Sequence, residues 1–257
     1  MEIVGLIPAA GQGSRIGPLP CSKEVYPVGF GSFPGKLGMW PKASCQYVMD
    51  KMRLAGIRKV FFVLREGKWD IPLFLGDGQN CGMHIAYLMR NLPYGVPFTL
   101  DQAYPFLEDK MVALGWPDII LQGENEYQQL ADCQNATNAD VVVGLFPADR
   151  PEKVDMVELD GHGRIKEIVI KPKKTRLCYT WGMAIWTPVF SEFLHEFVLT
   201  AQQSAENSPE IYIGDVFRAA FQQGLKVEAV QVSDKPWIDI GTPEDLRRVL
   251  RIFQTMD

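Results

Sequence analysis

A glycine-rich segment near the N-terminus carries residue types that bind phosphate. Gly11, Gly13, Ser14 and Arg15 follow a short apolar run that we expect to be a strand. Glycines let backbone N–H groups approach an anion closely, and successive N–H groups form a concave site for phosphate. Lys23 follows eight residues after Arg15, so the segment also offers a guanidinium fork and an ammonium charge.

The segment differs from the two common nucleotide-binding loops. A G-x-G-x-x-G fingerprint would need glycine where Ile16 stands, and a Walker A loop would continue with Gly-Lys and Ser or Thr. Taken alone, the segment is therefore compatible with a phosphate site, and equally with a tight turn followed by solvated surface cations.

The surrounding elements alternate between strand-like apolar runs and helix-like stretches, as in an α/β domain with a largely parallel sheet. We expect one domain over residues 1–257, a Rossmann-like mixed sheet flanked by helices. The expected strands cover residues 3–9, 59–64, 111–115, 140–146, 179–186 and 226–232, with a hairpin from 154–159 and 164–170. The expected helices cover residues 44–55 and 215–223.

Capping patterns predict two further helix starts. Thr99 and Gln102 have the spacing of a capping box, and Thr242 followed by Pro243 and two acids is typical of an N-cap. The glycine-rich segment 29–41 is too irregular for a core element and predicts a flap or a disordered tip. Segment 91–98 is predicted to be a second rigid loop.

Composition excludes several classes of protein. The 257 residues are 47% hydrophobic and 22% charged, which excludes a disordered or coiled-coil chain. A net charge of -5 argues against nucleic acid as a partner. No apolar run approaches the roughly 18 residues of a membrane span. Five widely spaced cysteines without a C-x-x-C pair favour free thiols and a cytoplasmic location, and a homo-oligomer is left open.

At the level of motifs, the chain resembles the nucleotidyltransferases that make nucleotide sugars, in particular the glucose-1-phosphate thymidylyltransferases. The family pattern has a strand, then G-x-G-[ST]-R, then Lys-x-x-x-Pro. Here the expected first strand is followed by Gly11 to Arg15, which match the first motif, and by Lys23 to Pro27, which match the second. Further matches follow in the same order: Leu54 to Arg58, Leu75 to Gly78 with Gly82, Lys171-Pro172, and the W-x-D-x-G-T of Trp237 to Thr242. The resemblance implies a Rossmann-like, mixed α/β nucleotidyltransferase fold.

The resemblance also implies roles on the nucleotide side. Backbone N–H groups of Gly11, Gly13 and Ser14, with Ala10 beside them, would hold a triphosphate. Gly95 and its loop would face the base.

Charged residues complete the site implied by the resemblance. Arg15 would bind the departing pyrophosphate, Lys23 the α-phosphate region, and Lys171 the phosphate of the sugar. Asp118 and Asp239 would hold Mg²⁺, an ion that prefers hard carboxylate oxygens. From the residues alone, Asp118 could equally be a turn residue and Asp239 a surface acid at a strand end.

The acceptor side departs from the family pattern more than the nucleotide side does. Ile170 stands where the family has the Glu of Glu-Lys-Pro, and Val154-Asp155 replaces Tyr-Gly. On the nucleotide side, Ala10 replaces a glycine, and two residues are inserted before Asp118 in the Leu-Gly-Asp motif.

These observations predict a Mg²⁺-dependent enzyme that joins an NTP to a sugar 1-phosphate and releases pyrophosphate, with dTTP and glucose 1-phosphate as the first pair to test. Two alternatives remain: a uridylyl or cytidylyl transferase with another phosphorylated acceptor, and a non-catalytic nucleotide-binding regulator.

Overall fold

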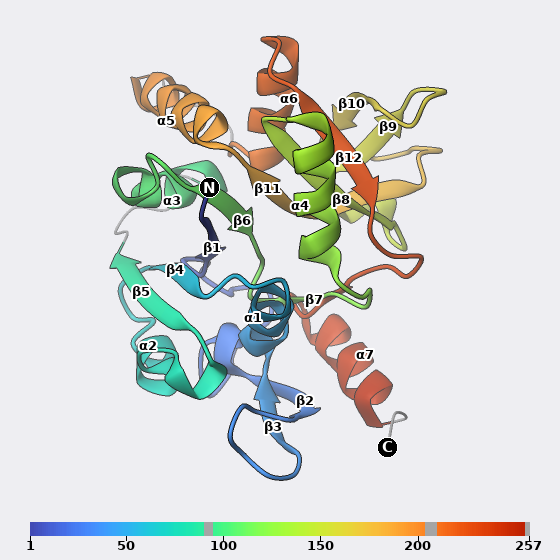
Figure 1. Ribbon diagram of the computed structural model, residues 1–257. Coiled ribbons are helices and arrows are strands. Elements are labelled where there is room, and N and C mark those ends of the chain that lie inside the picture. The colour runs from blue at the N-terminus through green and yellow to red at the C-terminus, as the bar shows by residue number, and fades with distance from the viewer. Residues whose placement is uncertain (90–94, 204–209, 255–257) are drawn as a thin grey trace.

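The computed structural model describes residues 1–89, 95–203 and 210–254, and Figure 1 shows their arrangement. The main sheet has the order β10-β9-β11-β6-β1-β4-β5, and β8 and β12 extend it from β11. Its strands are β1 (Ile3–Pro8), β4 (Lys59–Leu64), β5 (His84–Met89), β6 (Met111–Leu114), β8 (Val141–Pro147), β9 (Met156–Leu159), β10 (Ile165–Val169), β11 (Tyr179–Trp186) and β12 (Val227–Gln231). The sheet is mixed: β4, β1 and β6 run parallel, whereas β11 runs antiparallel to β6 and β8.

Helices cover both faces of this sheet (Figure 1). They are α1 (Ser44–Leu54), α2 (Asp70–Leu75), α3 (Val96–Leu100), α4 (Glu126–Thr137), α5 (Pro188–Gln203), α6 (Ile213–Gln222) and α7 (Pro243–Gln254). Short 3₁₀ turns are η1 (Lys23–Val25), η2 (Gln79–Cys81), η3 (Asp101–Phe106) and η4 (Pro151–Lys153). Two small ladders lie outside the sheet, one between β2 (Pro27–Gly31) and β3 (Trp40–Ala43), the other between β7 (Ile119–Ile120) and β13 (Ile238–Asp239).

The central strands are apolar along their whole length because both of their faces are buried. All four residues of β6 are buried, and so are six of the seven in β8, whose Val141-Val142-Val143 run is β-branched. One core cluster joins the sheet to α1 and α4, and the other joins it to α3, α5 and α6. The predicted mixed α/β fold is thus confirmed.

The sheet order places a switch point at β1. The chain passes from β1 to β4 on one side and later returns to β6 on the other side. Loops that follow parallel strands at such a point leave a crevice between them, which is where ligands bind in open α/β sheets. Residues 9–16, 65–69 and 115–118 follow β1, β4 and β6 and lie at this edge.

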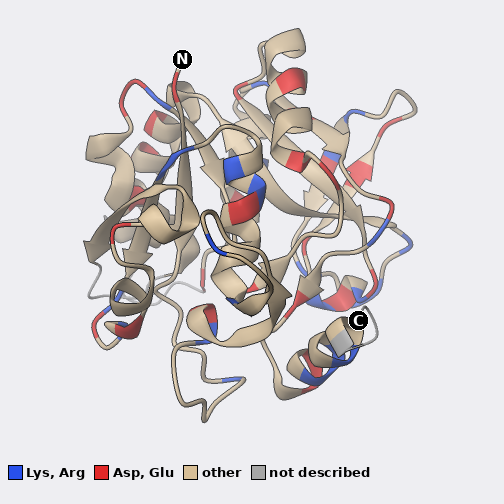
Figure 2. Ribbon diagram, turned by 60° about the horizontal axis from the view of Figure 1, so that its bottom comes forward, with Lys and Arg blue, Asp and Glu red and all other residues tan. Residues whose placement is uncertain are grey.

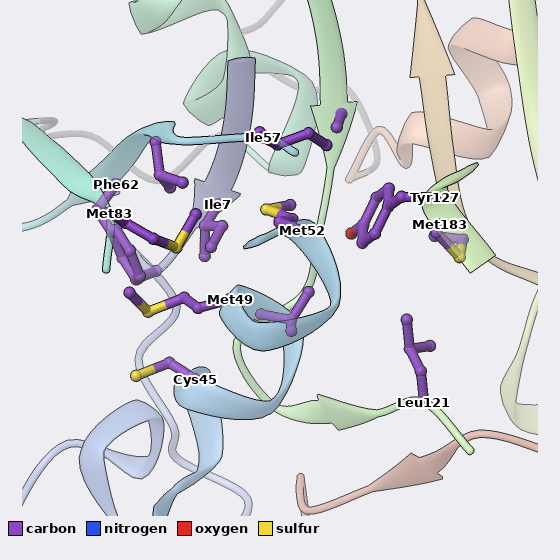
Figure 3. Close-up of a cluster of buried hydrophobic side chains, with 14 of the residues drawn as sticks. Ile7, Cys45, Met49, Met52, Ile57, Phe62, Met83, Leu121, Tyr127 and Met183 are labelled. Atoms are coloured by element: carbon purple, nitrogen blue, oxygen red, sulfur yellow. The ribbon is translucent and has the colours of Figure 1, made fainter. Parts of the chain in front are cut away.

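Helix α1 packs closely on the backbone just after β6. Figure 3 shows Met49 and Met52 of this helix pointing into a cluster with Ile7 and Phe62. A Cβ atom on Gly115 would lie 2.6 Å from a carbon atom of Met52. The contact therefore requires glycine at the start of the loop that carries Asp118.

Most predicted elements are present, with shifts of one or two residues at their ends. The predicted hairpin is β9 and β10, paired antiparallel, and the predicted helix at 215–223 begins two residues earlier as α6. Thr242 caps α7, because its hydroxyl oxygen accepts the Asp245 N–H at 3.2 Å.

Three predictions about local structure are wrong in whole or in part. The helix expected to begin at Thr99 begins at Val96, so Thr99 lies inside α3, where its hydroxyl donates to the Gly95 carbonyl at 3.3 Å. For segment 29–41, the structure contradicts the disordered tip and leaves the flap untested, because residues 29–31 pair with residues 40–42 in the antiparallel β2–β3 hairpin. The second predicted rigid loop, 91–98, is wrong for its last three residues, which lie in α3, and its residues 91–94 lie outside the described residues.

Charges of both signs are interspersed along the ribbon (Figure 2). Among the described residues, no helix is both long and apolar enough to cross a membrane.

We expect Gly115→Ala to lower the free energy of unfolding by about 1–3 kcal/mol, because the new methyl group must displace Met52 and Val48. Urea unfolding of the variant measures this loss. Gly161→Ala is the matched control, since a Cβ there has no neighbour within 4 Å. Equal losses in the two variants would contradict the close packing of α1 on Gly115.

Candidate active site

A cavity of about 370 Å³ lies at the carboxyl edge of β1 and β6. Five of the residues predicted for the site line it: Ala10, Gly11, Lys23, Gly95 and Asp118. Pro8, Gln12, Glu24, Val96, Thr99, Trp116, Pro117 and Glu210 complete its wall. The structure thus brings together residues from the first quarter of the chain with Gly95 and Asp118, which come much later in the sequence.

The loop after β1 presents unpaired hydrogen-bond donors at the mouth of this cavity. In the described part of the chain, the backbone N–H groups of residues 11–15 donate no hydrogen bond. The Gly13 carbonyl accepts the N–H groups of Ile16 and Gly17, both at 3.2 Å, which closes the loop into a turn. Gly13 has a φ of +66°, a conformation that favours glycine. A run of free N–H groups in such a turn fits an anion such as phosphate.

Lys23 and Asp118 form an ion pair on the cavity wall, with side chains 13% and 19% exposed. Burial acts to lower the pKa of Lys23, but the adjacent Asp118 carboxylate outweighs it and raises that pKa above the usual range. Burial likewise acts to raise the pKa of Asp118, but Lys23 holds that pKa below its usual range. Both groups are therefore charged at neutral pH.

Four contacts fix the loop that carries Asp118. The Gly115 N–H donates to the Leu6 carbonyl at 3.1 Å, and the Ser44 hydroxyl of α1 donates to the Pro117 carbonyl. The Asp118 carbonyl accepts the Ile240 N–H at 3.1 Å, and Ile119 pairs with Asp239 in the β7–β13 ladder. This ladder brings Asp239 beside Asp118.

Asp239 is the second carboxylate of this cluster. The Gly241 N–H donates to its Oδ1 at 2.7 Å. Burial and the nearby Asp118 carboxylate raise the pKa of Asp239 to about 6, although the Gly241 N–H and Lys23 oppose this shift. A cation between the two carboxylates would offset their repulsion.

Two hard carboxylates are a donor set that fits Mg²⁺. Within the described residues, no third Asp, Glu, His or Cys joins them to form a metal cluster. Mg²⁺ keeps several water ligands and is commonly held by one or two carboxylates together with phosphate oxygens of a substrate. Asp118 and Asp239 are therefore the residues that would hold the ion here.

The structure places Arg15 beside Asp239. A Cβ atom added to Gly241 would lie 3.4 Å from a guanidinium nitrogen of Arg15. The same Cβ atom would also contact the Asp239 carboxylate, so the two side chains approach each other at Gly241. Arg15 does not line the cavity, and neither does Ser14, which is exposed.

Lys171 lies at a separate part of the site. Its ammonium sits 3.6 Å from the centre of the Tyr212 ring, and the Tyr212 hydroxyl donates to Glu210 at 3.1 Å. Glu210 lines the cavity and Lys171 does not, so Lys171 is linked to the cavity wall through Tyr212 and Glu210. Burial raises the pKa of the neighbouring Asp155 to about 6, although the ammonium of Lys171 opposes this shift.

Sequence reasoning missed an ion pair next to Lys23. The Lys68 ammonium lies 2.6 Å from Glu24, and these side chains are 6% and 1% exposed. Glu24 lines the cavity. Its position directly after Lys23 is a signal that could have been used, but its partner comes 44 residues later in an unrelated loop.

A turn with free N–H groups, an ordered lysine and a pair of carboxylates thus lie together at the switch point of the sheet, where open α/β sheets bind their ligands. A model of the nucleotidyl transferase family matches residues 4–255. The chain belongs to this family and is a nucleotidyltransferase, which confirms the resemblance drawn from its motifs.

Relatives and a solved structure agree with this assignment. A glucose-1-phosphate thymidylyltransferase of Neisseria meningitidis is 25% identical over 98% of this chain and 83% of its own length. A low-salt glycan biosynthesis nucleotidyltransferase of Haloferax volcanii is 24% identical over 94% of this chain, which spans 63% of that longer protein. In fold, the chain is similar to a putative glucose-1-phosphate thymidylyltransferase of Bacillus anthracis solved with sucrose, with a TM-score of 0.81, 20% identity, and coverage of 99% of this chain and 96% of the other.

The raised pKa of Asp155 predicts a pH-dependent stability. A carboxyl group whose pKa is higher in the folded than in the unfolded protein favours folding below the unfolded pKa of 3.8, and this contribution is lost as pH rises through about 6. Asp155→Asn should therefore stabilise the protein at pH 8 by roughly 2–3 kcal/mol and show little gain near pH 4.

Urea unfolding at the two pH values measures this effect. Asp132→Asn on the exposed side of α4 removes the same charge and is the matched control. A gain from Asp155→Asn that is the same at both pH values would contradict the buried position of this carboxyl group.

Proposed function

We propose that this nucleotidyltransferase joins a nucleoside triphosphate to a sugar 1-phosphate with the assistance of Mg²⁺, giving a nucleotide sugar and pyrophosphate. The observation that carries the proposal is the cluster of Lys23, Asp118 and Asp239 beside the unpaired N–H groups of residues 11–15. The names of the relatives favour dTTP and glucose 1-phosphate as the substrates.

The reaction is a displacement at phosphorus. A phosphate oxygen of the acceptor attacks the α-phosphorus, and the bond from that phosphorus to the oxygen bridging to the β-phosphorus breaks. The bond's electron pair stays on the bridging oxygen, which leaves as part of pyrophosphate. The attacking phosphate is already ionised at neutral pH, so the step needs neither a protein nucleophile nor a general base.

The protein's main task is to bring two anionic substrates together. The N–H groups of residues 11–15 and the Lys23 ammonium would bind and orient the triphosphate, and Lys171 would bind the acceptor phosphate. Mg²⁺ held by Asp118 and Asp239 would supply positive charge at the phosphate oxygens. The base would lie near Gly95, which lines the same cavity as Ala10 and Gly11.

The acceptor end favours a second candidate, a transferase with a different phosphorylated acceptor, and Ala10 in place of a family glycine leaves uridylyl or cytidylyl transfer open for it. A Cβ on Gly214 of α6 would lie 2.7 Å from Ile170 and 2.5 Å from an Asp155 oxygen, so both side chains pack against the start of this helix. Ile170 offers no hydrogen bond to a sugar hydroxyl where the family pattern has Glu. Selectivity for a hexose must then come from other residues.

A panel of substrates tests the proposal. The protein is mixed with Mg²⁺, one of ATP, GTP, CTP, UTP or dTTP, and one of a set of sugar phosphates, and release of pyrophosphate is measured. We expect release only for particular pairs, with dTTP and glucose 1-phosphate among the active ones. Release with UTP or CTP and another acceptor would support the second candidate, and no release with any pair would favour a nucleotide-binding regulator.

Asp239→Asn tests the role of the carboxylate pair. We expect turnover to fall by about 10²–10³-fold, because the variant loses one charge next to Asp118. Thermal unfolding should show that the fold is retained, since an amide can still accept the Gly241 N–H. Asp234→Asn, an exposed change in the preceding loop, is the matched control. Unchanged turnover in Asp239→Asn would refute a role in metal binding.

A further inference from the structure

A second cavity of about 210 Å³ adjoins the first on the other side of the glycine-rich loop. Gln12 and Lys23 line both cavities. The second cavity is closed by Gly13 on one side and by Arg65 and Lys68 on the other. It therefore lies between the loops that follow β1 and β4, whereas the first cavity lies between those that follow β1 and β6.

Arg65 is held at this edge by the pairing of β1 with β4. Pro8 pairs with Val63, and the Ala9 N–H donates to the Val63 carbonyl at 2.8 Å, so the residues after both strands emerge side by side. Across the described chain, the Arg65 guanidinium forms neither a hydrogen bond nor a salt bridge, and its Nε is buried without a partner. A partly buried guanidinium without a counter-ion is costly and suits an anionic ligand.

The other charges around this cavity are already matched. Lys23 is paired with Asp118, and Lys68 with Glu24. Asp70 accepts both the backbone N–H and the hydroxyl of Ser22, at 2.6 and 2.7 Å. Of the charged side chains that line this cavity, Arg65 is therefore the one without a partner among the described residues, and the free N–H groups of the glycine-rich loop lie beside it.

We propose that this second cavity binds the β- and γ-phosphates of the nucleotide and then the pyrophosphate formed from them, with Arg65 as the principal side-chain ligand and Lys68 beside it. With the α-phosphate at Lys23, on the boundary between the cavities, the nucleoside occupies the first cavity and the leaving group the second. The broken bond then lies at that boundary, and each product has its own exit.

This inference rests on the proposed function and changes one of its assignments. The resemblance gives pyrophosphate to Arg15, but Arg15 lies beside Asp239 and Gly241 and lines neither cavity. Arg65 belongs to none of the motifs that carry the resemblance. Its assignment comes from the cavity and from its missing counter-ion.

Direct binding measurements test the proposal without any turnover. Calorimetry with Mg²⁺ measures the Kd of inorganic pyrophosphate, and separately of dTMP and UMP, for the unaltered protein and for Arg65→Gln. We expect Arg65→Gln to weaken pyrophosphate binding by about 10–100-fold, as for loss of hydrogen bonds to a charged group. The Kd of dTMP or UMP, whichever of the two binds to the unaltered protein, should stay the same.

Two further variants sharpen the result. Arg65→Lys keeps the charge but loses the fork, so its pyrophosphate affinity should be intermediate. Arg164→Gln in the exposed β9–β10 turn is the matched control and should bind pyrophosphate normally. Thermal unfolding checks that each variant is folded.

The outcomes separate this inference from the proposed function. If the unaltered protein transfers nucleotides, but the Arg65→Gln variant binds pyrophosphate as tightly as the unaltered protein, the pyrophosphate site is refuted and the function stands. If the protein transfers no nucleotide, yet pyrophosphate binding depends on Arg65, the anion site stands and the function is refuted. Failure of the unaltered protein to bind pyrophosphate would also overturn the inference.

Discussion

The site depends on one electrostatic arrangement: two carboxylates share a partly buried space with a single lysine. Lys23 pairs with Asp118, whereas burial and the nearby Asp118 carboxylate raise the pKa of Asp239 to about 6. The Arg15 guanidinium lies near Asp239, and the neighbouring loop offers the free N–H groups of residues 11–15. A ligand that brings a divalent cation together with phosphate oxygens satisfies both sides at once.

The fold holds this arrangement largely through contacts to the backbone of the loop that carries Asp118. The loop after β6 is tied to β1, to α1 and to β13, and close packing of α1 leaves no room for a side chain at Gly115. The carboxylates are therefore placed by the main chain, and their side chains need few partners of their own. The acceptor end is built differently, from Lys171, Asp155 and Tyr212 around the start of α6.

The sequence was sufficient to predict those parts of the structure that depend on local pattern. Apolar runs predicted β1, β4, β8 and β11, because strands buried on both faces contain few polar residues. The motifs also predicted a site that contains Lys23, Gly95 and Asp118, and the structure places these residues around one cavity. Their catalytic roles remain predictions.

Other features could not be predicted because they depend on distant contacts or weak patterns. Helix α4 is mostly polar, so its sequence has little amphipathic signal, whereas the apolar spacing of Phe190, Leu194 and Val198 in α5 could have been recognised. The Glu24–Lys68 pair and the position of Arg65 depend on β1 lying next to β4. Thr99 was misassigned because a capping pattern inside a helix looks the same as one at its start.

The β7–β13 ladder has a consequence for how the enzyme is assembled. It joins residues that are 118 and 120 positions apart in the chain (238 minus 120, and 239 minus 119), through a ladder of only two paired positions. Contacts of such long sequence separation form late in folding, since they carry the largest loss of chain entropy. During synthesis, residues 11–15 therefore emerge well before β13, so both carboxylates are present only once most of the chain has been made.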